Sequence, residues 1–188
     1  MPDSLTVVTL CGSLRRASYN AAIARALPGL APEGLRVAAL GSIGEFPLYN
    51  ADLQAQGFPA PVTAMAEAIR AADGILVVTP EYNYSIPGGL KNAIDWLSRL
   101  PNQPFAGKPM AIQSASMGAL GGARAQYHLR QSVVFLDALV LNRPEVMVAA
   151  AQTKISEAGE ITDEATRGFI QAQLKAFGDF IRRVALPR

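Results

Sequence analysis

Residues 5–20 read LTVVTLCGSLRRASYN, an apolar run followed directly by a polar loop. The run at 5–11 is rich in β-branched residues and ends at a glycine, which predicts a buried strand. A helix is expected at 19–27, ending at the Pro-Gly pair that follows it. Strand, polar loop and helix in this order form the repeating unit of α/β folds.

The rest of the chain repeats this unit. Further strands are expected at 35–40, 74–79, 110–114 and 139–149, and further helices at 61–72, 88–99, 122–138 and 163–184. The strands are apolar on both faces, which is typical of a parallel sheet covered by helices on both sides. Five such units favour a doubly wound α/β fold with strand order 2-1-3-4-5. We expect one domain covering residues 1–188.

Composition excludes several classes of protein. The chain has 188 residues, a net charge of +2, one cysteine (Cys11) and one histidine (His128). An internal disulfide and a Cys/His zinc cluster are therefore excluded, and we expect no metal site. The mixed charges argue against a nucleic-acid partner that relies on a large basic field. We expect no membrane contact and a cytoplasmic protein, because no apolar run spans a bilayer and MPDSL does not begin a secretory signal.

The loop after the first strand has the chemistry of a phosphate site. Backbone N–H groups at a helix N-terminus attract anions, and nearby hydroxyl and guanidinium groups strengthen such a site. The loop has three short hydrogen-bonding side chains, Ser13, Ser18 and Asn20, and two positive charges, Arg15 and Arg16. The loop lacks both the P-loop and the dinucleotide fingerprints, so the expected ligand carries a single terminal phosphate, as a mononucleotide does. A capped helix start with solvated arginines remains the alternative.

The loop after the third strand is long and rigid. Residues 79–96 read TPEYNYSIPGGLKNAIDW, with two prolines, two glycines and two tyrosines. Backbone amides and aromatic side chains at the carboxyl edge of a sheet suit a flat heteroaromatic ligand. An ordinary long loop made of turn residues remains the alternative.

These two stretches also carry a family resemblance. Together with QSASMGALGGARAQYHLRQ (113–131) and FLDALVLNRPE (135–145), they resemble the NADPH-dependent FMN reductase family, which includes chromate, quinone and azo-dye reductases. The bacterial chromate and quinone reductases are the branch that they resemble in particular. The similarity extends from residue 5 to about residue 150, and its segments fall on the loops expected at the crevice of the sheet.

The resemblance implies a flavodoxin-like fold and non-covalent FMN, with NADPH or NADH as co-substrate. It implies ping-pong hydride transfer from NAD(P)H through the flavin to quinones, azo or nitro compounds, chromate or free flavin, and it implies no catalytic protein side chain. By position, Ser13, Arg15, Ser18 and Asn20 would hold the FMN phosphate, Pro80, Glu81, Tyr82 and Asn83 (with Ser85 nearby) would line the ring and ribityl chain, and Ser114, Ser116 and Gly118 would close the other side.

Other residues are assigned by the same comparison or by pattern. The family assembles as homodimers or homotetramers, and Tyr84, Arg124, Tyr127 and Glu145 match positions that form polar contacts between subunits. His128 is expected to be structural because it lies within a helix, and Cys11 and Trp96 are expected in the core. The loop at 115–122 is small and flexible, which predicts an open flavin face and broad acceptor use.

Three other functions are compatible with this sequence. One is a reductase that supplies reduced FMN to a partner monooxygenase, another is a flavodoxin-type electron carrier, and the third is a flavin-independent nucleotide-binding or signalling α/β domain. The carrier is disfavoured because such proteins are usually strongly acidic, whereas this chain is slightly positive. The sequence leaves four questions open. They are the physiological acceptor, the choice between NADPH and NADH, whether the assembly is a dimer or a tetramer, and whether FMN stays bound during turnover.

Overall fold

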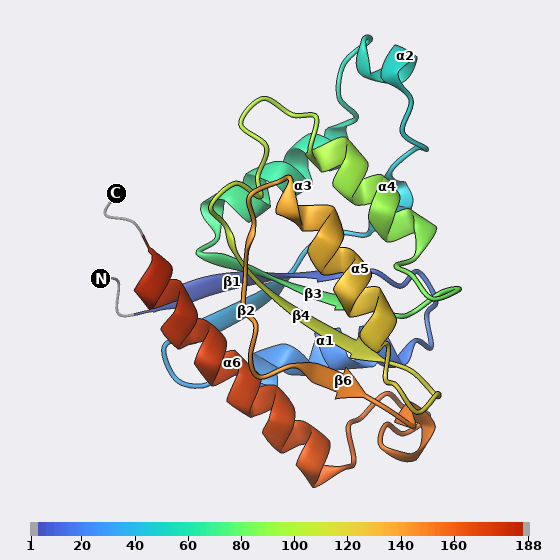
Figure 1. Cartoon of the computed structure of the whole chain (residues 1–188), viewed down its shortest axis with the longest axis vertical. Coiled ribbons are helices and arrows are strands. Elements are labelled where there is room, and N and C mark those ends of the chain that lie inside the picture. Colours follow the sequence, from blue (N-terminus) through green and yellow to red (C-terminus); the bar gives the residue numbers. More distant parts are fainter. Residues whose placement is uncertain (1–3, 186–188) are drawn as a thin grey trace.

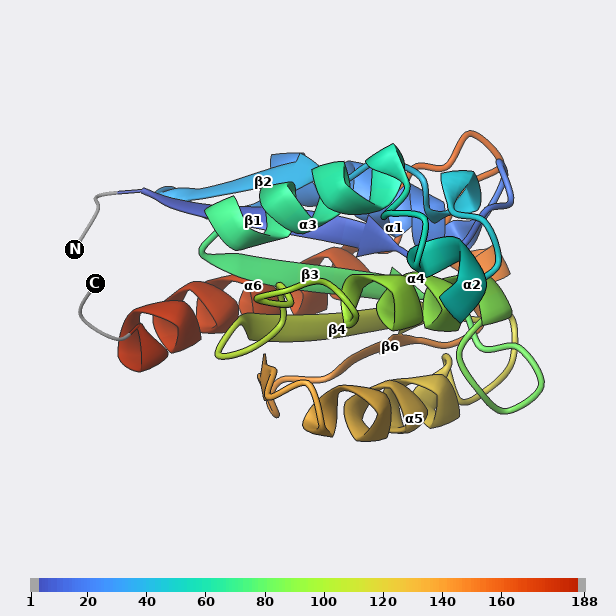
Figure 2. The same cartoon turned by 90° about the horizontal axis from the view of Figure 1, so that it is seen from above.

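The structure is a computed structural model and describes residues 4–185. Its strands are β1 (Leu5–Cys11), β2 (Leu35–Ala39), β3 (Gly74–Thr79), β4 (Pro109–Ala115), β5 (Leu139–Val140) and β6 (Val146–Val148). All pair in parallel in the order β2-β1-β3-β4-β5, and β6 also pairs with β4. The predicted order 2-1-3-4-5 is therefore confirmed, and the strands all run toward the same end of the molecule (Figure 2).

Helices cover both faces of this sheet (Figure 1). They are α1 (Tyr19–Leu30), α2 (Ala51–Gln54), α3 (Ala60–Ala71), α4 (Gly88–Leu97), α5 (Ala123–Val134) and α6 (Glu164–Val184), with short 3-10 turns η1 (Ile43–Glu45) and η2 (Ala151–Thr153). The helices α1 and α6 lie on one face, and α3, α4 and α5 lie on the other. Between residues 4 and 185, no helix has the length and apolar content needed to cross a membrane.

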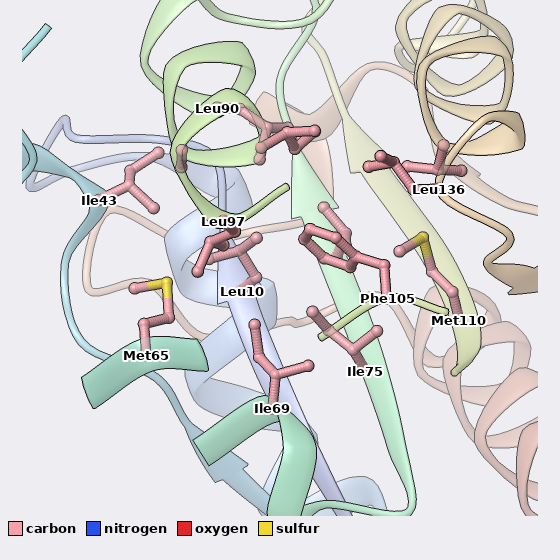
Figure 3. Packing of buried hydrophobic residues seen from close by; sticks show 14 of the residues in the cluster. Leu10, Ile43, Met65, Ile69, Ile75, Leu90, Leu97, Phe105, Met110 and Leu136 are labelled. Atoms are coloured by element: carbon pink, nitrogen blue, oxygen red, sulfur yellow. The ribbon is translucent and has the colours of Figure 1, made fainter. Parts of the chain in front are cut away.

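Alternating strand residues supply two separate cores. Leu10, Ile75 and Met110 point toward α3, α4 and α5, where Figure 3 shows them packed with residues of those helices and of the loops beside them. Their neighbours Val7 and Leu76 point to the opposite face and pack under α1 and α6. Both faces of the central strands are buried, which explains why those strands are apolar without alternation.

The prediction of one continuous strand at 139–149 is wrong. It divides into β5, which pairs with the start of β4, and β6, which pairs with the end of β4. Pro144 lies in the gap, and a proline has no N–H group to donate to a strand ladder. The fifth position of the sheet is therefore filled by two short segments.

Two helix ends differ from expectation by more than two residues. The first helix does not end before Pro28 but continues through it to Leu30, because Leu27 and Leu30 are buried under the sheet. A proline in the last turn removes only one helical hydrogen bond, and that burial offsets the loss. The helix expected at 122–138 ends at Val134. The elements η1 and α2, between β2 and α3, carry no periodic pattern and were not predicted.

Candidate functional site

The loops that follow β1, β3 and β4 meet at the carboxyl ends of the strands, at the same end of the molecule (Figure 2). The first two approach most closely at Gly12, whose N–H donates to the carbonyl of Val78 at 2.8 Å. A Cβ atom at Gly12 would lie 2.8 Å from the Thr79 hydroxyl oxygen, so no larger residue fits there. The two loops separate from this point on either side of the β1–β3 crevice, where ligands of doubly wound sheets bind.

Asn20 connects α1 to the end of β4. Its side chain is buried, donates from Nδ2 to the carbonyl of Ala115 at 2.9 Å, and accepts from the N–H of Ala115 at 2.8 Å. Both side-chain polar atoms therefore bond to the protein itself. Asn20 positions the N-terminus of α1 beside the third loop, a role that its place in a polar loop did not reveal.

Glu81 connects the loop after β3 to α5. The N-cap of this helix is Gly122, which has no side chain to satisfy the first N–H groups. The Glu81 carboxylate accepts instead from the N–H groups of Arg124 and Ala125 at 3.1 and 3.3 Å, and from the Arg124 guanidinium at 3.0 Å. A negative charge at a helix N-terminus is favourable, so Glu81 fixes its loop against α5.

The residues after Glu81 form a tight turn. Tyr82 and Ser85 exchange two backbone hydrogen bonds, at 2.9 and 3.0 Å, and Asn83 and Tyr84 between them have φ of 49° and 66°. This geometry exposes Tyr82, Asn83 and Tyr84 at the edge of the site. The Arg124 guanidinium lies 3.8 Å from the centroid of the Tyr84 ring, which braces the turn from the side.

His128 lies within α5 and not on a site loop, as expected. Its side chain is exposed, and Nδ1 lies 3.0 Å from the Ser85 hydroxyl oxygen. The ring therefore contacts one of the site loops, which is compatible with the structural role predicted for it. Helical periodicity gave no signal for this contact, because it depends on how α5 packs beside the turn. Trp96, by contrast, is fully buried as predicted and donates its indole N–H to the Pro47 carbonyl at 2.8 Å.

The loop after β4 is braced at its base by hydrogen bonds and by close packing. The buried Ser114 hydroxyl donates to the carbonyl of Gly121 at 2.6 Å, and the Ser116 hydroxyl accepts from the N–H of Gly118 at 3.1 Å. Gly121 has φ of 58°, and a Cβ atom there would lie 2.6 Å from the backbone of Met147. The loop is therefore held against β6 while its tip, residues 117–120, stays exposed.

The loop before α1 keeps its anion-binding groups available. Arg15 and Arg16 are exposed, and the Ser18 hydroxyl caps α1 by accepting from the N–H of Ala21 at 3.4 Å. The remaining N–H groups of the first turn have no intrahelical partner, as at any helix N-terminus. Ser13 begins the loop and is half-buried.

Cys11 is a poor nucleophile at neutral pH. Burial raises the pKa of its thiol, and the bond to the Ser13 carbonyl and the positive charge of Arg25 oppose this effect only in part. The prediction that Cys11 lies in the core is wrong, because its side chain is only half-buried.

The comparisons with known proteins assign the family. The model of the NADPH-dependent FMN reductase family matches residues 5–153, more than three quarters of the chain and all three loops of the site. The chain belongs to the NADPH-dependent FMN reductase family.

Individual relatives agree with this assignment over nearly their whole length. A quinone reductase of Escherichia coli (strain K12) is 59% identical over 99% of this chain and 100% of the relative. The NAD(P)H-dependent FMN reductase PA1204 of Pseudomonas aeruginosa is 52% identical over 98% of this chain and 99% of the relative. The solved structure of FerB, a flavoenzyme NAD(P)H:(acceptor) oxidoreductase from Paracoccus denitrificans, has a TM-score of 0.86 at 37% identity and covers 97% of this chain and 100% of its own. This member of the NADPH-dependent FMN reductase family is therefore an FMN-dependent NAD(P)H oxidoreductase with a flavodoxin-like fold.

The site of this FMN reductase has polar and apolar groups of the kinds that FMN needs. A helix N-terminus with exposed arginines suits the phosphate, and the close packing of Gly12 on Thr79 brings the loop after β1 beside the loop after β3. Large apolar side chains are exposed on the three loops, which suits a flat ring; they are Leu14, Tyr82, Met117 and Leu120. The structure thus brings together the three segments that the sequence singled out.

Proposed function

We propose that quinones are electron acceptors of this enzyme. The observation that carries this proposal is the exposed apolar rim on the three loops, at the crevice to which the family assignment directs FMN. An aromatic or quinonoid acceptor can stack on the flavin ring, and exposed apolar side chains favour such a flat, uncharged molecule. The quinone reductase name of the relative that is 59% identical supports the same acceptor class.

The FMN phosphate would bind at the N-terminus of α1. Arg15, Ser13 and the Ser18 hydroxyl would hold it together with the first backbone N–H groups of the helix, as hydrogen-bond donors to a dianion. Asn20 would act through position: its two bonds to Ala115 keep the helix N-terminus facing the crevice.

The ring and ribityl chain would lie between the other two loops. Pro80, Glu81, Tyr82, Asn83 and Ser85 would line one side, and Ser114, Ser116 and Gly118 would line the other. Glu81 and Ser114 already bond to α5 and to Gly121, so they would support the walls rather than touch the ring with their polar atoms. Loops fixed in this way need little reorganisation when the ligand binds.

The chemistry divides between the cofactor and the protein. When bound, FMN supplies the two-electron redox chemistry that links NAD(P)H to the acceptor. The chain binds and orients: the phosphate loop anchors one end, the tight turn at 82–85 defines one edge, and the exposed tip at 117–120 leaves access for substrates. Because access is open, we include azo and nitro compounds, chromate and free flavin among the acceptors.

Supply of reduced FMN to a partner monooxygenase is the second candidate function. It is favoured by one observation: residues 14–17 of the phosphate loop are exposed, which would let FMN leave between turnovers. Retention or release of FMN separates the two functions.

We further propose that residues 1–188 form one FMN-binding domain of a cytoplasmic homodimer or homotetramer. Tyr84, Tyr127 and Glu145 are exposed, and Arg124 lies beside Tyr84. Within the chain, the Tyr127 hydroxyl lies 3.4 Å from a Glu145 carboxylate oxygen, so both polar groups lie at the surface, where a second subunit would reach them.

The test begins with the visible spectrum of the purified protein. A flavin spectrum that bleaches on anaerobic addition of NADPH and returns with stoichiometric benzoquinone is expected, with FMN released on denaturation. Initial rates at varied NADPH and benzoquinone should give parallel double-reciprocal lines. Flavin that bleaches with NADPH but does not reoxidise with any quinone would contradict the acceptor proposal.

A matched pair of variants tests the phosphate loop. Arg15→Gln should weaken FMN binding by roughly 10-fold, because a charge-assisted hydrogen bond is lost. Arg183→Gln, in the last turn of α6 at the opposite end of the sheet, should leave FMN binding unchanged. Equal affinities for the two variants would remove Arg15 from the site.

A further inference from the structure

A cavity lies alongside α1, next to the loop that precedes the helix. Its volume is about 400 Å³. One wall is made by residues 15–19 with Ala22 and Arg25 of α1, and the opposite wall is made by residues 155–159. The cavity therefore begins at the phosphate loop and continues along the flank of the helix, away from the loops that follow β3 and β4.

The charge of this cavity favours an anion. Three guanidinium groups line it, from Arg15, Arg16 and Arg25, against one carboxylate, from Glu157. In the described part of the chain, none of these three arginines forms an ion pair with an acidic side chain. A guanidinium group donates in a planar fork that matches phosphate oxygens, so the cavity has the donor set of a phosphomonoester site.

Arg25 enters the cavity from farther along the helix than Arg15 and Arg16. It follows the N-cap Ser18 by seven residues, which corresponds to about 10 Å between the two positions along the helix axis. Its guanidinium lies against Gly159, where a Cβ atom would be 2.8 Å from the Arg25 Nη2 atom. The cavity thus has basic groups from the flank of the helix as well as from the loop before it.

The opposite wall is held in place before any ligand binds. Buried Ile155 and Ile161 pair across it as an isolated bridge, and Ser156 accepts the N–H groups of Gly159 and Glu160 at 2.9 and 3.1 Å. Gly159 has φ of 83°, which favours glycine and allows the wall to approach Arg25. A preformed wall reduces the entropy lost on binding.

We infer that this cavity binds a phosphomonoester through Arg16 and Arg25, and that the 2′-phosphate of NADPH is its source. The inference rests on the proposed function, which supplies NADPH as co-substrate and assigns the FMN phosphate to the helix N-terminus beside Arg15. The site would make the enzyme prefer NADPH to NADH, because NADH lacks this phosphate. The FMN phosphate is the other possible source of the same chemistry, and the experiment separates the two.

The experiment compares Arg25→Gln and Arg16→Gln with the wild-type holoenzyme, using NADPH and NADH with benzoquinone. Each variant should raise the KM for NADPH by roughly 10- to 100-fold, the loss expected for one charge-assisted hydrogen bond. The KM for NADH and kcat should stay unchanged, and for Arg25→Gln so should the affinity for FMN. Arg183→Gln serves as the control and should change none of these values.

Binding is also measured without turnover. Adenosine 2′,5′-bisphosphate should bind the FMN-loaded protein in calorimetry more tightly than 5′-AMP, and Arg25→Gln should abolish the difference. Glu157→Gln gives a gain in the opposite direction: it removes the carboxylate that repels a phosphate and should lower the KM for NADPH. This variant keeps the proposal testable if an arginine variant fails to fold.

The outcomes distinguish the proposals. Variants that weaken FMN binding but leave the ratio of the KM for NADPH to the KM for NADH unchanged would overturn the NADPH assignment. They would indicate that the cavity binds the FMN phosphate instead. Variants that change neither quantity would overturn the phosphomonoester site altogether. In both cases NADH-driven quinone reduction would persist, whereas failure of the proposed function would abolish it in the wild-type protein.

Discussion

At the scale of single residues, the Asn20 side chain joins α1 to the end of β4. Its two hydrogen bonds satisfy both backbone groups of buried Ala115. Asn20→Ala leaves that N–H and that carbonyl without partners, which should lower the free energy of unfolding by roughly 2–4 kcal/mol. Urea denaturation measures this loss, with Gln171→Ala on the exposed surface of α6 as a control expected to stay within about 0.5 kcal/mol of wild type. An equally small effect for Asn20→Ala would show that water replaces the side chain.

The same residues show what the sequence predicts and what it leaves undetermined. Polar side chains after apolar strands predict where a ligand binds, since parallel strands end at one edge. They do not predict where each side chain points. Asn20, Glu81 and Ser114 bond to backbone groups 95, 43 and 7 residues away along the chain. Such partners are known only after distant elements have packed, so the sequence located the site while the structure separates supporting residues from those facing the crevice.

At the scale of elements, the N-terminus of α6 depends on one carboxylate. The Asp163 carboxylate accepts from the Thr166 hydroxyl at 2.6 Å and from its N–H at 2.8 Å, and these bonds hold the pKa of Asp163 below its ordinary value. A lowered pKa in the folded state means that the stabilisation is complete above the ordinary pKa of aspartate and disappears as the pH falls through the lowered value. Asp163→Ala should therefore lower the thermal midpoint at pH 7 by roughly 2–4 °C, the shift expected for the loss of one N-cap.

The matched variant Asp163→Asn separates the cap from its charge. It keeps an acceptor for the helix N–H groups, so at pH 7 most of the stability should remain, but the part of the pH dependence that the Asp163 carboxylate contributes, at pH values below about 4, should be lost. Thermal melts of the wild type and both variants across this range make the measurement. If the wild type and Asp163→Asn had the same pH dependence, ionisation of the Asp163 carboxylate would not contribute to the stability of the helix end.

Element boundaries are the part of the fold that local pattern predicts least well. Pro28 and Pro144 are both chain-breaking residues, yet α1 continues through the first while the fifth strand divides around the second. The two prolines differ in which backbone hydrogen bonds they remove. In the last helical turn one bond is lost and two leucines are buried, whereas in a strand the ladder itself is interrupted.

At the scale of the whole molecule, the three loops of the site belong to three neighbouring strands, so the site exists only in the folded chain. A ligand that binds only the native state stabilises it by about 2.7 kcal/mol when its concentration is 100 times its Kd. For a chain of this length, that corresponds to a rise in the thermal midpoint of roughly 5–11 °C. We expect FMN to produce this rise in protein stripped of flavin.

Riboflavin is the matched ligand for this last prediction, because it has the same ring and ribityl chain without the phosphate. If the N-terminus of α1 anchors FMN, riboflavin at the same concentration should raise the midpoint by much less, and Arg15→Gln should bring the FMN shift down toward the riboflavin value. Differential scanning fluorimetry over a concentration series gives both shifts in one experiment. Equal shifts for the two flavins would mean that the ring provides all of the binding and that the exposed arginines before α1 have no part in holding the cofactor.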